Sequence, residues 1–398
     1  MNTSIFRIIY YLILLPMAFI FVLPVVIIIR VLRPFYLVRI GFINNGIFGH
    51  FTFEPEYYLS KKVKSKTVSL DLFFFYSIKS VNKQWVKMVK RNIHVNLFVR
   101  YIYKVNNLFP GGEIHVVNIV DSGARDTNNL FHDVKQQIKL LSDEELYAEV
   151  CLKELGFKKD DKFVCIISRD SAYKDKINPK RSWSYHNYRD SDIDNYKDAA
   201  FQLADMGYFV FRIGSIVEKE FNVAHDRVID YASSNVRSDL LDIYLVSKCA
   251  FIIVGESGLS SLAITFRVPI AFVNLSAIEY VLSSNTNIIS IMKKLWLRKE
   301  ERYLSFDEIF KKGIGRFLHN DQYEELGIDL IENTPKEIIE IAMEMHASIS
   351  GVSRVTIEDE ALQRKFWSLL PKSELHGYPI LARIGSSYLK NNQNLLLK

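Results

Sequence analysis

The stretch "IIVGESGLSSLAITFRVPI", residues 252–270, joins an apolar run typical of a buried strand to a helix through a Gly-Glu-Ser-Gly turn. The turn is not a G-x-S-x-G nucleophile elbow, because Leu259 stands where the second glycine would be. It is not a P-loop either, because no lysine follows Ser257 before the helix begins. Two interpretations remain. Either the free N–H groups of the helix N-terminus bind an anion, typically a phosphate, or Ser257 is an ordinary N-cap.

Strands and helices alternate on both sides of this turn, a pattern typical of βαβ units and a parallel sheet. The apolar runs predict the following strands and helices. Strands are expected at 35–42, 67–77, 93–99, 114–120, 163–170, 208–214, 227–232, 251–256 and 269–274, and helices at 143–156, 193–206, 238–248 and 258–266. The predicted fold class is therefore α/β, with two Rossmann-like domains facing a cleft and an N-terminal membrane helix.

The length and composition fit this organisation. A chain of 398 residues suits two domains with an appendage, here predicted as an anchor (1–34), two Rossmann-like domains (35–155 and 156–350) and a helical tail packing back across them (351–398). The net charge of +6 suits an anionic membrane surface or phosphorylated ligands, and no basic and aromatic array indicates nucleic acid. The three cysteines lie in apolar stretches without metal-ligand spacing, which favours a reducing compartment.

The first thirty residues contain a long apolar run. Residues 8–29 carry no charge and would reach about 33 Å as a helix, enough to cross a bilayer core. No small-residue cleavage site follows, so a signal peptide is disfavoured. Basic residues are more numerous after the run than before it, which predicts that the rest of the chain lies on the cytoplasmic face of a membrane. Pro16 and Pro24 leave a spanning helix and a re-entrant hairpin both open.

Candidate ligand-binding residues gather in loops that follow strands. Ligands of such sheets bind at the carboxyl ends of the strands, where the loops after Ser168 and Ile213 and the turn at 255–258 would meet. A phosphate there would contact Arg169 and the helix terminus together, because a bidentate arginine suits phosphate oxygens. The candidates are Arg169, Asp170, Arg189, Arg212, Gly214, Glu256, Ser257, Gly258, Ser260 and Ser261. A surface salt bridge for Arg169 and a structural pair for Arg212 are the alternatives.

Three longer stretches carry a family resemblance. They are "RIGFINNGIFGHFTFEPEYYL" (39–59), "HNYRDSDIDNYKDAAFQLADMGYFVFRIGSIVEK" (186–219) and "DYASSNVRSDLLDIYLVSKCAFIIVGESGLSSLAITFRVPIAFVN" (230–274). Through them the chain resembles a family of bacterial glycosyltransferases from surface-polysaccharide (O-antigen and capsule) gene clusters. The first stretch resembles its N-terminal motif and the other two resemble its C-terminal domain. The family is similar in layout to GT-B transferases, whose C-terminal domain holds a nucleotide-sugar and whose N-terminal domain holds the acceptor.

This resemblance implies an enzyme that needs no metal or other cofactor, because GT-B sites stabilise the leaving diphosphate with basic side chains and a helix terminus. The sequence agrees, since "DSDID" (190–194) precedes a helix and reads as N-cap acids rather than as a metal-binding D-x-D. In the N-terminal domain His50 is the best candidate for a general base, because imidazole titrates near neutrality. Glu54 and Glu56 are the alternatives, and a structural histidine is the other interpretation of His50.

The predicted function is transfer of a sugar from a nucleotide-sugar donor to a glycan acceptor that is lipid-linked and lies at the cytoplasmic face of the bacterial inner membrane. The membrane, the donor and the acceptor are the expected partners. Two alternatives stay open. One is a polysaccharide pyruvyltransferase, which shares a layout of two Rossmann domains and uses phosphoenolpyruvate. The other is a non-catalytic, anchored partner that binds nucleotide-sugars in a polysaccharide assembly complex.

Overall fold

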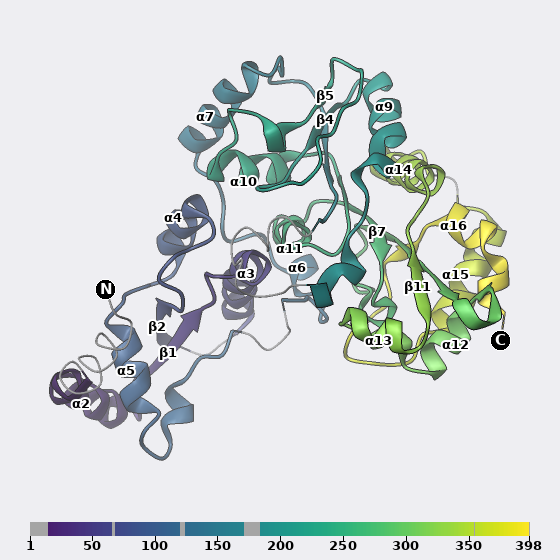
Figure 1. The fold of residues 1–398 in the computed structure, drawn as a ribbon. Helices are drawn as coiled ribbons and strands as arrows, with labels where there is room; N and C mark the ends of the chain where they lie inside the picture. Colours follow the sequence, from purple (N-terminus) through teal and green to yellow (C-terminus); the bar gives the residue numbers. More distant parts are fainter. Residues whose placement is uncertain (1–14, 66–67, 120–123, 171–183, 354, 398) are drawn as a thin grey trace. The chain divides into compact units, whose positions relative to one another are not determined.

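The computed structural model describes residues 15–65, 68–119, 124–170, 184–353 and 355–397 (Figure 1). The chain forms two compact units. Unit 1 comprises Met1–Ala124 and Val134–Lys139, and unit 2 comprises Arg125–Asp133 and Leu140–Lys398. The predicted boundary between residues 155 and 156 therefore lies inside unit 2.

Unit 1 is built on a small parallel sheet. Strands β1 (Leu37–Ile43) and β2 (Ser69–Phe75) pair in register over their whole length, with α3 (Phe48–Lys64) as the crossover between them. Single parallel bridges, Ile40 to Val116 and Phe73 to Val95, extend the sheet on either side. The predicted strands at 93–99 and 114–120 are thus reduced to one bridge each. The first gives way to α5 (Val99–Asn106), and a 3-10 turn over Gly112–His115 occupies the start of the second.

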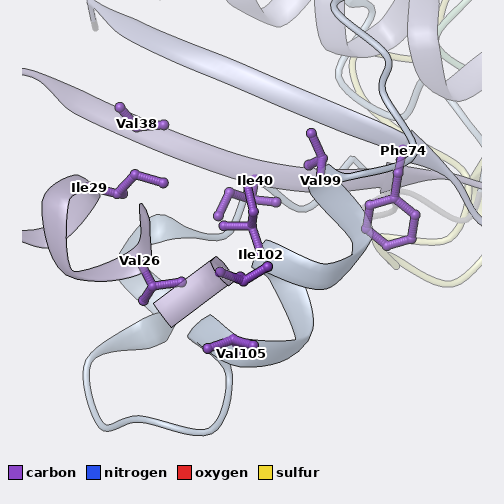
Figure 2. Packing of buried hydrophobic residues seen from close by; sticks show 9 residues of the cluster. Val26, Ile29, Val38, Ile40, Phe74, Val99, Ile102 and Val105 are labelled. Atoms are coloured by element: carbon purple, nitrogen blue, oxygen red, sulfur yellow. The ribbon is translucent and has the colours of Figure 1, made fainter. Parts of the chain in front are cut away.

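The apolar N-terminal segment is part of the core of unit 1. Helix α2 (Leu15–Leu32) turns Val22, Val26 and Ile29 onto one face, where each is at most 7% exposed. This face packs on β1 and on α5, and Figure 2 shows Val26 and Ile29 beside residues of both elements. The spacing of four and then three residues explains the single face, because 3.6 residues complete one helical turn.

The predicted membrane helix is wrong for the part of the chain that the structure describes. No helix in the described ranges is both long enough and apolar enough to cross a membrane. Residues 1–14, which hold the start of the predicted segment, lie outside those ranges. At the other end of α2, the Arg30 guanidinium donates hydrogen bonds to the carbonyl oxygens of Asn106 (3.0 Å) and Pro110 (2.9 Å). This arginine thus holds the C-terminal end of α2 against another segment of unit 1.

Unit 2 contains a seven-stranded parallel sheet, which confirms the predicted α/β class. The order across the sheet is β12-β8-β7-β6-β3-β4-β5. The strands are β3 (Phe163–Ile167), β4 (Phe209–Arg212), β5 (Val228–Ile229), β6 (Ile252–Val254), β7 (Ile270–Leu275), β8 (Ile288–Met292) and β12 (Arg383–Ile384). From β3 the chain builds outward through β4 and β5, and it then returns to place β6 on the other side of β3. This reversal is the topological switch point of a doubly wound sheet.

Helices and a second sheet complete the two units. A three-stranded antiparallel sheet has the order β10-β9-β11. Its strands are β9 (Lys294–Leu297), β10 (Arg302–Tyr303) and β11 (Ile328–Ile331). The remaining helices are α4 (Lys83–Asn92), α6 (Leu130–Asp133), α7 (Ser142–Lys153), α9 (Lys197–Asp205), α10 (Asp239–Lys248), α11 (Gly258–Thr265), α12 (Phe306–Lys311), α13 (Asn320–Glu325), α14 (Pro335–Ile349), α15 (Ile357–Leu369) and α16 (Ser386–Asn391). The C-terminal residues add β12 to the large sheet and pack α16 beside α14.

Candidate functional site

The candidate site of unit 2 lies at the switch point of its large sheet. Strands β3 and β6 are direct neighbours, with Ile167 opposite Val254 at their carboxyl ends. Arg169 lies two residues after the end of β3, and Glu256 lies two residues after the end of β6. In doubly wound sheets ligands bind in the crevice at this position, because the loops on its two sides run apart. The sequence-predicted loops after β3 and β6 are therefore brought together.

The N-terminus of α11 lacks a side-chain cap. Ser257 occupies the N-cap position with extended backbone, but its hydroxyl makes no capping bond. Its Oγ is buried and has no hydrogen-bond partner among the described residues. By contrast, Ser238 caps α10 by accepting from Leu241 N at 3.2 Å. Ser257 is therefore not the ordinary N-cap of the alternative interpretation, and its buried hydroxyl is an unsatisfied polar group beside the positive end of the helix.

The other two serines of this turn have different surroundings. The Ser260 hydroxyl donates to the carbonyl oxygen of Ser257 at 2.6 Å and thereby stiffens the first turn of α11. Ser261 is the next residue and is partly exposed. Gly258, the first residue of the helix, carries no side chain that would separate a ligand from the backbone. The first turn of α11 thus combines backbone N–H groups with close access.

Arg169 is a largely buried cation, and Glu256 of this turn is among its electrostatic neighbours. Its side chain is 11% exposed, forms an ion pair with Asp190 and donates to the carbonyl oxygen of His186 at 3.1 Å. Burial lowers the pKa of Arg169 to about 10, and the nearby charge of Arg189 acts in the same direction. The guanidinium is still charged at neutral pH. Arg189 itself lies over the Tyr188 ring at 5.4 Å, and its buried Nε has no partner within the described part of the chain.

Glu256 is held in place by the backbone beyond β7. Its carboxylate accepts from the backbone N–H of Ser276 at 3.1 Å and from the Ser276 hydroxyl. Among its electrostatic neighbours are Arg125, Arg169 and Lys293. A carboxylate that is fixed and surrounded by cations in this way is suited to accept hydrogen bonds from ligand hydroxyl groups.

The carboxyl ends of β3 and β4 and the loops after them hold the remaining predicted residues. Arg212, whose side chain is 1% exposed, pairs with Asp230 at 3.0 Å and donates to the carbonyl oxygen of Lys219 at 3.1 Å. Asp170 accepts from the backbone N–H of Glu218 at 3.0 Å. A Cβ on Gly214 would lie 2.9 Å from a methyl group of Val217. These contacts match the structural interpretation of Arg212, and ligand binding by Arg212, Asp170 and Gly214 stays a prediction.

The general-base candidates of unit 1 lie on α3. His50 and Glu54 are one helical turn apart, and the distance from His50 Nδ1 to Glu54 Oε1 is 2.6 Å. The Glu54 side chain is 1% exposed, whereas that of His50 is 32% exposed. With an ionised Glu54, which can only accept hydrogen bonds, Nδ1 is the donor of this pair, and in the neutral imidazole Nε2 then carries the lone pair. This pair has the arrangement of a general base oriented by a carboxylate.

Glu56 has a different role. Its side chain is fully buried, and its carboxylate accepts from the backbone N–H groups of Gln137 (3.0 Å) and Ile138 (2.8 Å). These bonds join α3 to the segment Val134–Lys139, which returns to unit 1 from the second unit. A carboxylate whose oxygens already accept hydrogen bonds from the backbone is poorly placed to take a proton from a substrate.

The sequence matches no protein-family profile and no curated protein. Several solved structures are similar to the chain. One is a glycosyl transferase family 9 protein from Veillonella parvula DSM 2008, with 10% identity, a TM-score of 0.46, and coverage of 78% of this chain and 97% of the other. A second is E. coli ADP-heptose LPS heptosyltransferase II, with 12% identity, a TM-score of 0.40, and coverage of 79% of this chain and 100% of the other. A third is the iron-containing dodecameric glycosyltransferase TibC from enterotoxigenic E. coli H10407, with 13% identity, a TM-score of 0.37, and coverage of 78% of this chain and 77% of the other. These similarities are too distant to assign an activity.

Sequence reasoning missed two cations near Glu256. Arg125 donates to the carbonyl oxygen of Tyr280 at 2.7 Å, and burial lowers the pKa of this arginine to about 10. Lys293 donates to the carbonyl oxygen of Asp190 at 2.5 Å, and burial lowers its pKa as well. Lys293 directly follows β8, so the rule that selected Arg169 could have found it. Arg125 has no such local signal, because it lies far from the Gly-Glu-Ser-Gly turn (255–258) in the sequence.

Proposed function

We propose that the chain is a glycosyltransferase of GT-B layout that binds a nucleotide-sugar in unit 2. The observation that carries this proposal is the switch point, where the uncapped N-terminus of α11 and the Arg169 guanidinium adjoin the carboxyl ends of neighbouring strands. Backbone N–H groups at a helix N-terminus and an arginine fork both favour phosphate oxygens. The resemblance of residues 186–219 and 230–274 to surface-polysaccharide glycosyltransferases supports the same assignment.

The chemistry follows from these groups. As the bond between sugar and diphosphate breaks, negative charge builds on the leaving diphosphate, and the helix terminus with Arg169 and Ser257 stabilises it. As the acceptor oxygen forms its bond to the anomeric carbon of the sugar, Nε2 of His50 in unit 1 takes the proton of that hydroxyl, and Glu54 stabilises the imidazolium that forms. Glu256 accepts hydrogen bonds from donor hydroxyl groups.

The finer parts of the proposal rest on the sequence resemblance. The acceptor is a lipid-linked glycan of bacterial surface-polysaccharide synthesis, and transfer takes place at the cytoplasmic face of the inner membrane, where such acceptors lie. This location follows from the acceptor and does not depend on a membrane-spanning helix.

Transfer is proposed to need no metal. Within the described ranges, no group of three or more His, Cys, Asp and Glu side chains is placed to hold a metal ion. That statement does not decide the requirement, so turnover has to be measured with and without EDTA. Equal rates support the proposal, and a loss that added Mg²⁺ or Fe²⁺ restores contradicts it.

A binding experiment tests the donor site. Wild-type protein is titrated with uridine and guanosine diphosphates and with phosphoenolpyruvate, and Arg169→Ala and Gly258→Val are titrated in parallel. We expect each substitution to weaken nucleoside diphosphate binding about tenfold to hundredfold, the effect of losing one charge-assisted hydrogen bond or of blocking close approach. Arg227→Ala is the matched control, because Arg227 donates to the carbonyl oxygen of Gly207, ahead of β4 and so at the opposite edge of the sheet.

The outcomes separate the alternatives. Unchanged affinity in both site variants would place the donor elsewhere. Binding of phosphoenolpyruvate alone would indicate pyruvyl transfer. Nucleotide binding without turnover on lipid-linked acceptors would indicate a non-catalytic partner.

A further inference from the structure

Unit 1 contains a pocket of about 440 Å³ that the proposed chemistry does not use. Arg39 of β1, the C-terminal half of α3 and the segment Val116–Ile119 line it. The lining includes three cationic side chains, those of Arg39, Lys61 and Lys62, and none of the described lining residues is acidic. His50 and Glu54 are not among the lining residues, so the pocket is distinct from the general-base pair.

A buried carboxylate holds two of these cations in place. The Asp71 side chain is fully buried and accepts from Arg39 Nε (2.8 Å) and Nη2 (2.9 Å) and from Lys62 Nζ (3.3 Å). Tyr58 and Ser69 also donate to it. Burial alone would raise the pKa of Asp71, but the hydrogen bonds from Arg39, Tyr58 and Ser69 lower it to about 2. The carboxylate is therefore ionised at every physiological pH and fixes its cationic partners.

Arg39 keeps donor capacity after pairing with Asp71. The pairing uses Nε and Nη2, and Nη1 makes no hydrogen bond to any described residue. The Arg39 side chain is 26% exposed and that of Lys62 is 41% exposed, so both charged groups are within reach of a ligand from solvent. An arginine that is oriented in advance loses little conformational entropy when it binds an anion.

The rest of the lining suits a sugar. Tyr57, Val117 and Ile119 supply aromatic and apolar surface, and Ser65 and Asn118 supply hydroxyl and amide groups. The volume exceeds the space that a bare inorganic anion fills. We infer that this pocket binds an acidic sugar, whose carboxylate or phosphate is held by Arg39 and Lys62. This goes beyond the proposed function, because the pocket lies in unit 1 and does not depend on the nucleotide site.

Calorimetric titration of the full-length protein tests the inference with three sugars: glucuronate, glucose 6-phosphate and neutral glucose. We expect at least one of the acidic sugars to bind at least about tenfold more tightly than glucose, the effect of one charge-assisted hydrogen bond. Binding of only glucuronate or only glucose 6-phosphate assigns the acidic group as carboxylate or as phosphate ester. Equal affinity for all three sugars, or no binding of either acidic sugar, overturns the inference.

Variants locate the binding. Lys62→Gln leaves the pair of Arg39 and Asp71 in place and is expected to weaken binding of the acidic sugar about tenfold. Lys61→Gln is a second variant in case the first does not fold. Lys64→Gln is the matched control, since Lys64 lies on the same helix but does not line the pocket. Equal loss in Lys62→Gln and Lys64→Gln contradicts the assignment. Uridine diphosphate binding is expected to stay unchanged in all three, so failure of this inference is distinguishable from failure of the donor site.

Discussion

His50→Ala is expected to lower the turnover of sugar transfer about hundredfold or more, the scale of losing a general base, while donor affinity stays nearly unchanged. The reason is the hydrogen bond between His50 Nδ1 and Glu54, which leaves Nε2 as the proton acceptor. Steady-state kinetics with a nucleotide-sugar and a lipid-linked acceptor measures the turnover. Nucleoside diphosphate titration of the same variant measures the affinity.

Glu54→Gln provides the graded comparison. The amide oxygen of glutamine can still accept a hydrogen bond from Nδ1, but it carries no charge to stabilise an imidazolium. We therefore expect a loss of turnover that is smaller than that of His50→Ala. Near-normal turnover in His50→Ala would move the role to Glu54, because the Glu56 carboxylate is already engaged by backbone N–H groups. A retaining stereochemistry, determined by NMR of the product, would remove the need for this base.

Val26→Asp is expected to destabilise unit 1 by about 3 kcal/mol or more, because an aspartate would be buried among apolar side chains without a partner. Val26 is 1% exposed and lies in the cluster of α2, β1 and α5. Urea denaturation followed by circular dichroism measures the change, with limited proteolysis as a second readout should the two units unfold separately.

Ile27→Asp is the matched control for this substitution. Ile27 is the next residue of the same helix and is 51% exposed, so we expect a change within about 0.5 kcal/mol. The same denaturation midpoint for Val26→Asp and the wild-type protein would show that α2 does not pack on the rest of unit 1. Equal destabilisation by both substitutions would show that the helix buries both of its faces.

The sequence was informative where local pattern and topology agree. The strand, turn and helix at 252–270 and the loop after Ser168 were predicted, because buried parallel strands read as apolar runs and their carboxyl ends share one side of the sheet. The orders of the strands were not predictable, because each depends on pairings between distant segments. The contacts of Arg125 and of Glu56 depend on the same distant pairings.

The N-terminal segment shows a different reason for failure. A membrane helix and a helix on the core of a domain can have the same composition, and periodicity separates them only when one face is polar. In α2 the exposed face is also apolar, with Ile20, Phe21 and Ile28 more than half exposed. The distinction therefore came from packing on β1 and α5, which the sequence alone does not contain.

The position of the candidate donor site within its sheet has a thermodynamic consequence. β3 and β6 have paired strands on both sides, so their amides should be among the slowest in unit 2 to exchange with deuterium. Folding therefore already fixes the strand ends that carry Arg169 and the turn before α11, ahead of any ligand. Association of a diphosphate there should restrict side chains and loops but not the strands themselves. The conformational entropy lost on binding should be correspondingly small.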